Sequence, residues 1–307
     1  MAALSILMIL ISAAVIPGII SITKAKLSGR KGITLFQPLK DIVRLFRKGN
    51  VYSTTTSLIF QITPVIHFAG IFCALLFLPF SGEAGLLSFS GDFLFFAYLL
   101  AFTKFMLIIN AMDTGSGFEG MGANREALYS MLVEPAFFTI MASLVLLTGF
   151  TSFQEVYNNV HFGDSSLSYL FAAVSIYLLV QIAMVENSRL PVDDPRTHLE
   201  LTMIHEVMVL DNSGFDLGLI MTGNAFKFAI YGNLIANFLL PQSFPLVANI
   251  AIYLVVQLLF AVTVGLLESF RARNKIANNP QFIITLSSIA LVLFFSVLII
   301  THKLILD

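Results

Sequence analysis

Long apolar runs constrain this chain more than any other feature of its sequence. A helix of about 20 apolar residues matches the hydrocarbon thickness of a bilayer. Eight such runs occur, at about 2–22, 57–80, 92–112, 128–150, 166–186, 216–240, 246–267 and 281–302. The linkers between them are mostly too short for a separate soluble domain. The sequence therefore predicts an all-α membrane protein with eight transmembrane helices, in which residues 1–307 form one polytopic domain.

The composition agrees with this class and excludes several chemistries. Charged residues make up 11% of the chain and the mean hydropathy is +0.89, whereas about a quarter of a soluble domain is charged. The single cysteine, Cys73, provides neither a disulfide nor the four thiolates of a usual iron–sulfur cluster. His198, His205 and Glu206 lack the spacing of a zincin site. We therefore expect no metal site in this chain and no catalysis by it alone; redox centres would belong to partners.

The distribution of lysine and arginine predicts the orientation. Of 17 such residues, eight lie between the first and second spans, one between the third and fourth, two between the fifth and sixth, and three between the seventh and eighth. The positive-inside rule places these four linkers in the cytoplasm and both termini outside. We therefore expect a multi-pass protein of a bacterial or archaeal cytoplasmic (inner) membrane, with the acidic loop 187–215 in the cytoplasm.

A short amphipathic helix is predicted at about 35–48, after the first span. Leu39, Ile42, Val43 and Phe46 fall on one helical face, and the basic residues fall opposite. Such a helix lies in the membrane interface. It is either a simple surface anchor or a gate or docking surface at the mouth of a cavity.

Several ionisable residues fall where lipid is expected. A charge at that depth costs a few kcal/mol and normally faces the bundle interior or a water path. The chain carries Lys104 in the third span, Glu134 before Pro135 in the fourth, Glu268 closing the seventh, and Asp113 and Glu186 at the ends of the third and fifth. Pairing that only holds the bundle together is one explanation. Their number favours a buried polar axis that relays protons, although a structural role is preferred for Lys227 and His67.

The segment after the fifth span, VENSRLPVDDPRTHLEL, is unusually rich in charge. Glu186, Asp193 and Glu200 recur at seven-residue intervals. Residues 192–195 are predicted to form a turn whose aspartate caps a helix from Arg196 to Met208. A solvated acidic loop is the default interpretation of such a segment. Acids fixed by prolines and joined to the Glu186 helix indicate a shaped vestibule instead.

Two motifs in the chain resemble a known family. One is E-x-x-R-x-P-x-D with a later glutamate, present as Glu186, Arg189, Pro191, Asp193 and Glu200; the other is G-A-x-R with a later glutamate, present as Gly122, Ala123, Arg125 and Glu134. Nearly the whole chain resembles the H-type membrane subunit of respiratory complex I, the NADH-quinone oxidoreductase. It is most similar to the branch found in group 4 nickel–iron hydrogenases, which includes formate hydrogenlyase and hydrogenase-4. Arg196 and His198 stand where the complex I form usually has acids, which places a complex-I-style quinone channel in doubt.

The resemblance implies a subunit that anchors a peripheral redox arm and begins a proton path toward antiporter-like membrane subunits. Glu186, Asp193, Asp194 and Glu200 would form an acidic funnel beneath an iron–sulfur cluster of the partner, and Glu134, Lys104 and Glu268 would continue it, with Asp113 beside them. The vestibule and the docking surface would be shaped by Arg125, Arg189, Pro191, Arg196, His198, Arg271 and Arg273.

Two other functions stay open at this point. The chain would be a quinone-reactive subunit of a complex-I-like NADH or ferredoxin dehydrogenase if a pocket under the amphipathic helix admitted a quinone tail. A stand-alone secondary transporter is disfavoured by the acidic loop and by the absence of an inverted repeat. The partner arm would carry iron–sulfur clusters, with or without a nickel–iron centre, and quinone or lipid could accompany the chain.

Overall fold

The computed structural model describes residues 2–159, 166–194, 203–240 and 244–301, and helices dominate this part of the chain. The long helices are α1 (Ala2–Leu27), α3 (Leu58–Leu75), α4 (Asp92–Asp113), α5 (Gly117–Thr148), α7 (Ser166–Glu186), α9 (Gly214–Leu239), α10 (Leu246–Phe270) and α11 (Asn279–Ile300). The short ones are α2 (Gln37–Phe46), α6 (Phe153–Asn159), α8 (His205–Met208) and the 3₁₀ helix η1 (Ile276–Asn278). The predicted all-α membrane class is confirmed.

Within the described residues, seven helices are long and apolar enough to cross a membrane; they are α1, α3, α4, α5, α7, α10 and the segment containing α11. The remaining predicted span corresponds to α9. Its 26 residues would extend about 39 Å, but it carries Asp216, Lys227 and several asparagines. Because α9 packs against α1, α2, α3, α7 and α10, its polar side chains face other helices. The count of eight spans stays a prediction.

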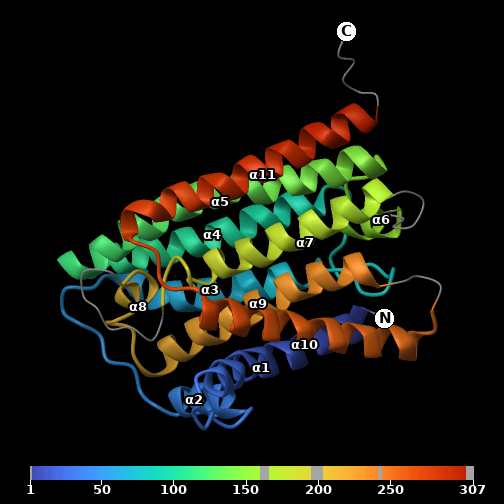
Figure 1. Cartoon of the computed structure of the whole chain (residues 1–307). Coiled ribbons are helices and arrows are strands. Elements are labelled where there is room, and N and C mark those ends of the chain that lie inside the picture. The colour runs from blue at the N-terminus through green and yellow to red at the C-terminus, as the bar shows by residue number, and fades with distance from the viewer. Residues whose placement is uncertain (1, 160–165, 195–202, 241–243, 302–307) are drawn as a thin grey trace.

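The helices run roughly along one direction and follow one another across the bundle (Figure 1). α11 packs on α5, α5 on α4, α4 on α3, and α3 on α9. α1 and α10 pack together on the far side of α9, while α7 touches both α5 and α9. Helices α7 and α9, which are distant in sequence from α4, therefore complete the centre of the bundle.

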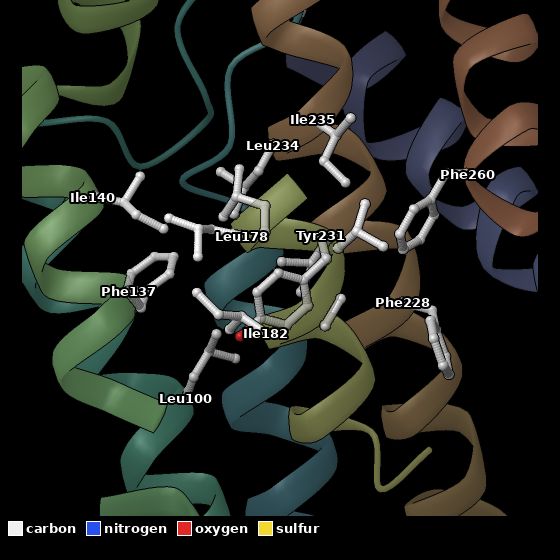
Figure 2. Close-up of a cluster of buried hydrophobic side chains, with 14 of the residues drawn as sticks. Leu100, Phe137, Ile140, Leu178, Ile182, Phe228, Tyr231, Leu234, Ile235 and Phe260 are labelled. Carbon is white, nitrogen blue, oxygen red and sulfur yellow. The ribbon is translucent and has the colours of Figure 1, made fainter. Parts of the chain in front are cut away.

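Large side chains from α4, α5, α7 and α9 fill that centre. Figure 2 shows Phe137, Leu178 and Ile182 directed toward Tyr231 of α9, and all four are less than 9% exposed. Lipid tails are as apolar as leucine, so close packing, and not exclusion of water, stabilises helices against each other in a membrane. The centre is thus a packed apolar region into which charged side chains enter only from defined positions.

The two ends of the bundle differ. One end, here called the α8 end, holds α2, α8 and the segment 271–278 between α10 and α11 (Figure 1). The opposite end, the α6 end, is tied by fully buried Asp92, which accepts hydrogen bonds from the Phe153 N–H at 2.8 Å and the Ser88 hydroxyl at 2.9 Å. The acidic loop after α7 belongs to the α8 end, because Arg273 reaches Asp193 there at 2.6 Å.

Two helices differ most from their predicted bounds, while α1 and α3 end about five residues from their predicted ends. The fourth span was expected to begin at about 128, but α5 already begins at Gly117, so Arg125 and Glu126 lie within a helix and not in a loop. The helix expected from Arg196 to Met208 begins, within the described residues, only at His205. Ile204 before it is non-helical, with φ −124° and ψ −75°. Asp193 does accept a hydrogen bond from the His205 N–H, at 3.2 Å.

Helix α8 rests directly on Gly122 of α5. A Cβ at Gly122 would lie 2.8 Å from the Ile204 carbonyl oxygen and 3.2 Å from Met208 Cγ. Because backbone cannot move aside cheaply, Gly122→Ala is expected to lower the free energy of unfolding by about 1–3 kcal/mol. Thermal unfolding in detergent would measure this. Gly120→Ala is the matched control, since a Cβ there meets nothing within 4 Å; equal unfolding midpoints for the two variants would contradict the contact.

Candidate functional site

Four charged side chains from four helices meet inside the bundle, and we call them the inner cluster: Lys104 of α4, Glu126 of α5, Glu186 of α7 and Lys227 of α9. The Lys104 ammonium lies 2.9 Å from Glu126 Oε1 and 3.2 Å from Glu186 Oε2. The Lys227 ammonium lies 3.5 Å from the same Glu186 oxygen. All four side chains are between 3% and 9% exposed.

The inner cluster contains two cations and two anions, so its net charge is zero when all four are ionised. Removing charges from water is expensive, and partners at this distance recover part of that cost. Interacting groups in such a site do not titrate independently, so a proton gained by one changes the affinity of the others. The arrangement can therefore store a proton and pass it on.

Two small cavities flank the inner cluster. The first, the inner cavity, measures about 10 Å³ and is lined by all four cluster members together with Asn187, His205, Asn224, Leu107 and Met208. That volume is at the lower limit of what can hold one water molecule. The second, the Glu134 cavity, measures about 30 Å³ and is lined by Lys104, Glu186, Glu134 and Tyr231 among others. Glu134 itself is half-buried.

A much larger cavity of about 440 Å³, the mouth cavity, opens at the α8 end. Pro38 and Ile42 of α2 line it, so the amphipathic helix covers it, while Leu39 and Val43 on the same helix are exposed. The exposed apolar residues fit a surface anchor, and the residues that line the cavity fit a gate at its mouth, so both interpretations of the amphipathic helix stay open. The mouth cavity shares its lining residues Asn187, His205 and Asn224 with the inner cavity. Polar side chains therefore connect the α8 end to the inner cluster.

Further ion pairs lie at the rim of the α8 end, and we call them the rim pairs. Glu268 is paired with Lys24 at 2.8 Å and with Arg189 at 3.4 Å. Asp193 is paired with Arg273 at 2.6 Å. A cleft of about 510 Å³ is lined by Lys24, Glu268 and Asp194 among others. The rim pairs place Glu268 and Asp193 close to basic residues from distant parts of the sequence.

Other residues singled out in the sequence make contacts outside the inner cluster, and their predicted roles stay predictions. Asp113 accepts the Ser57 N–H at 2.7 Å, beside the N-terminus of α3. Arg125 donates to the Met203 carbonyl at 3.1 Å, and the Pro191 carbonyl accepts the Asn274 N–H at 2.9 Å. Arg271 donates to Gln181 at 3.5 Å and lies over the Phe282 ring. Glu200, Arg196 and His198 lie outside the described residues.

One member of the inner cluster, Glu126, was missed in the sequence. The apolar run begins only at about 128, so Glu126 was assigned to a linker. Its helical spacing from Glu119, Ala123 and Ser130, all buried, was the available signal. Lys227 was given a structural role, and its pairing with Glu186 is compatible with that interpretation.

Burial shifts the pKa values of two groups outside the membrane-spanning helices. It raises the pKa of Asp193, against which the His205 N–H and the Arg273 guanidinium act. It lowers the pKa of His205 to about 4. Since His205 lines both the mouth cavity and the inner cavity, the ring between them is neutral near pH 7.

The lowered pKa of His205 predicts how local stability depends on pH. The unfolded segment would bind a proton below its ordinary pKa of 6.5, whereas the folded one binds it only near pH 4. The unfolded state therefore holds more protons in this window, so stability rises with pH from about 4 to 6.5 and is flat above. Amide-exchange protection factors of residues 203–212 should follow this course, and His205→Gln should flatten it. Equal slopes in both proteins would contradict the assignment.

Comparison with known protein families gives a match over almost the full length. Residues 1–301 match the family described as NADH dehydrogenase, and the chain belongs to that family. Hydrogenase-4 component C of Escherichia coli K12 is 28% identical over 266 residues, covering 85% of this chain and 82% of the relative. Formate hydrogenlyase subunit 4 of the same strain is 24% identical, covering 88% and 89%. The expected relationship to the hydrogenase branch of the family is confirmed.

More distant relatives agree with the fold. The H-type membrane subunit of the NADH-quinone oxidoreductase of Neisseria meningitidis serogroup C / serotype 2a is 25% identical over 193 residues, covering 60% of this chain and 52% of the relative. A chain in the structure of the membrane-bound sulfane sulfur reductase, an archaeal respiratory membrane complex, superposes with a TM-score of 0.81 at 20% identity. That match covers 96% of this chain and 99% of the other. The fold is therefore that of a membrane chain of a respiratory complex.

Proposed function

We propose that this chain is the membrane-anchor and proton-pathway subunit of a multisubunit respiratory-type complex, in which electron transfer in a peripheral hydrogenase-like arm drives ion translocation. The family and its hydrogenase relatives support a role in such a complex. The observation that carries the proton-pathway role is the inner cluster. Two lysines and two glutamates buried at the meeting point of four helices exceed what holding a bundle together requires.

The cavities define an order of groups along the proposed proton path. Protons would enter at the α8 end, which the lysine and arginine distribution assigns to the cytoplasm. They would pass the neutral ring of His205 and reach Glu186 through the inner cavity, which accommodates about one water. From Glu186 and Lys104 the Glu134 cavity leads to Glu134. Each step joins groups that line a common cavity.

Partners are expected at both ends of this path. The α8 end carries the rim pairs and the acidic loop, to which a peripheral arm bearing iron–sulfur clusters would bind. Glu134 is half-buried on α5, and a carboxylate at that depth normally avoids lipid. A second membrane subunit of the antiporter-like type would cover Glu134 and accept its proton. This chain contributes no redox centre of its own to the proposal.

The mouth cavity favours a second candidate, a quinone-reactive subunit. Its volume of about 440 Å³ is adequate for a small organic molecule. Its lining combines an apolar side, including Ile42, Ile220 and Phe228, with a polar end at Asn187, Ser188 and His205. A quinone has a matching distribution of an apolar tail and a carbonyl head. We place this function second because the hydrogenase relatives cover more of the chain.

Purification in mild detergent from the native membrane, followed by mass spectrometry and metal analysis, tests the proposal. Copurification of a hydrogenase-like large subunit with nickel and iron would support it. Iron without nickel, together with bound quinone, would favour the second candidate. A chain purified alone that transports a solute would contradict both.

A further inference from the structure

The side chain of His67 has no role in the path described so far. It lies on α3 with 0% exposure, at lipid depth, packed between α4 and α9. Its Nδ1 lies 3.3 Å from the carbonyl oxygen of Thr103, the residue before Lys104. A carbonyl accepts and cannot donate, so Nδ1 carries the hydrogen and Nε2 presents a lone pair.

The Nε2 atom of His67 is buried and has no hydrogen-bond partner among the described residues. It is directed at Gly223 of α9, where an added Cβ would lie 3.1 Å from Nε2 and 3.0 Å from Cδ2. The glycine therefore allows the ring edge to touch the backbone of α9. The amide of Asn224 donates to His205 Nε2, at 2.9 Å, and also lies close enough to act on the His67 ring, without a hydrogen bond of regular geometry to Nε2. A buried polar atom without a partner is costly, and such exceptions call for an explanation.

The ring edge faces α9 at Gly223, one turn before the inner cluster's second lysine. Residues four apart share a helical face, so Lys227 follows Gly223 on it, and helical side chains lean toward the N-terminus. The Lys227 side chain thus leans toward the place where Nε2 rests. Its bond to Glu186, at 3.5 Å, is the longest of the inner cluster.

We propose that His67 is a proton-accepting group of the buried axis that exchanges one proton with Lys227; this inference rests on the proposed function. The proton leaves the Lys227 ammonium and binds His67 Nε2, leaving a neutral amine and an imidazolium. Glu186 then loses one of its two cations and becomes a better acceptor for the next proton from the inner cavity. Return of the proton to Lys227 resets the site.

The charges around His67 couple its protonation to that of Lys227, so the two groups do not titrate independently. Lys227 of α9 and His205 of α8 are the titratable groups whose charges act on the ring, and Lys104 follows Thr103 on α4. No carboxylate in the described part of the chain contacts the ring in a hydrogen bond or ion pair. Because the ring itself has no carboxylate contact, an imidazolium at His67 beside the Lys227 ammonium is unfavourable. In this proposal His67 and Lys227 therefore hold one proton between them.

The substitution His67→Asn separates this role from a packing role. The asparagine amide can take the place of Nδ1 and keep the bond to Thr103, but it has no Nε2 and does not titrate. In inverted vesicles containing the intact complex, with reduced methyl viologen as electron donor and a pH-sensitive dye as reporter, we expect proton uptake to fall at least about tenfold. Assembly and viologen oxidation by the peripheral arm should be retained.

A double variant gives the decisive comparison. In a Lys227→Met background, His67→Asn should cause no additional loss of uptake, because the two residues act on one proton. Additive losses, or full uptake by His67→Asn alone, would overturn the proposal. If His67→Asn does not assemble, His67→Gln is measured by the same criteria, and failure of both to assemble would assign the imidazole a packing role. Absence of proton uptake by the unaltered complex would instead reject the proposed function itself.

Discussion

Glu186→Gln is expected to lower the free energy of unfolding by about 3–5 kcal/mol, the usual effect of removing one partner from a buried ion pair. Glu186 accepts from both lysines of the inner cluster, at 3.2 Å and 3.5 Å. Without its charge, Lys104 keeps Glu126, but Lys227 keeps no ion-pair partner within the described residues. Thermal unfolding of the purified protein in detergent would measure the loss.

The same change is expected to abolish proton uptake by vesicles, since Glu186 lines both small cavities. The exposed Glu155 on α6 provides the control: Glu155→Gln should leave both quantities unchanged. Combining Glu186→Gln with Lys227→Met removes the unpaired ammonium, so part of the stability should return while uptake stays lost. A Glu186→Gln protein that unfolds at the temperature of the unaltered one would show that the inner cluster is not energetically coupled.

The charged residues of this chain were partly predictable because lipid restricts where they can lie. Lys104 and Glu186 stood out as ionisable residues in or beside apolar runs, and the structure brings them to 3.2 Å. Their partners were not predictable, because a helical period identifies a buried face but not the helix it meets. Glu268 illustrates this, since its partner Lys24 belongs to α1, at the other end of the sequence.

The helices were more predictable than the segments that join them. Apolar runs located α4 and α7 within one residue of their ends. The start of α5 was missed by about ten residues, since its first turns carry Glu119, Arg125 and Glu126 and leave the apolar pattern. Glu119 and Arg125 contact Asp211 and Met203, on either side of α8, and Glu126 belongs to the inner cluster. These partners come from tertiary packing, which the local sequence pattern does not reveal. The loop that follows α7 depends on contacts such as Arg273 with Asp193 for the same reason.

Glu134→Gln is expected to reduce proton uptake by about 10²-fold, within the range found when a group that transfers protons is removed, while leaving the unfolding temperature nearly unchanged. Glu134 forms no ion pair within the described residues and is half-buried, so loss of its charge costs the fold little. It nevertheless lines the cavity that connects Lys104 and Glu186 to the surface of α5. Glu134→Gln should therefore lower proton uptake without lowering stability, whereas Glu186→Gln should lower both.

The length of the side chain at position 134 tests whether a titratable oxygen is what matters. Glu134→Asp keeps a carboxylate on a side chain one methylene shorter, and water in a cavity of about 30 Å³ can bridge the added distance. We expect this variant to retain much of the uptake. If Glu134→Gln translocates protons like the unaltered complex, the path does not leave the bundle at Glu134, and the carboxylate serves contact with a neighbouring subunit instead. If Glu134→Asp and Glu134→Gln lose proton uptake equally, a titratable oxygen at this position is not sufficient. Glu134 would then be one of the packing residues of α5.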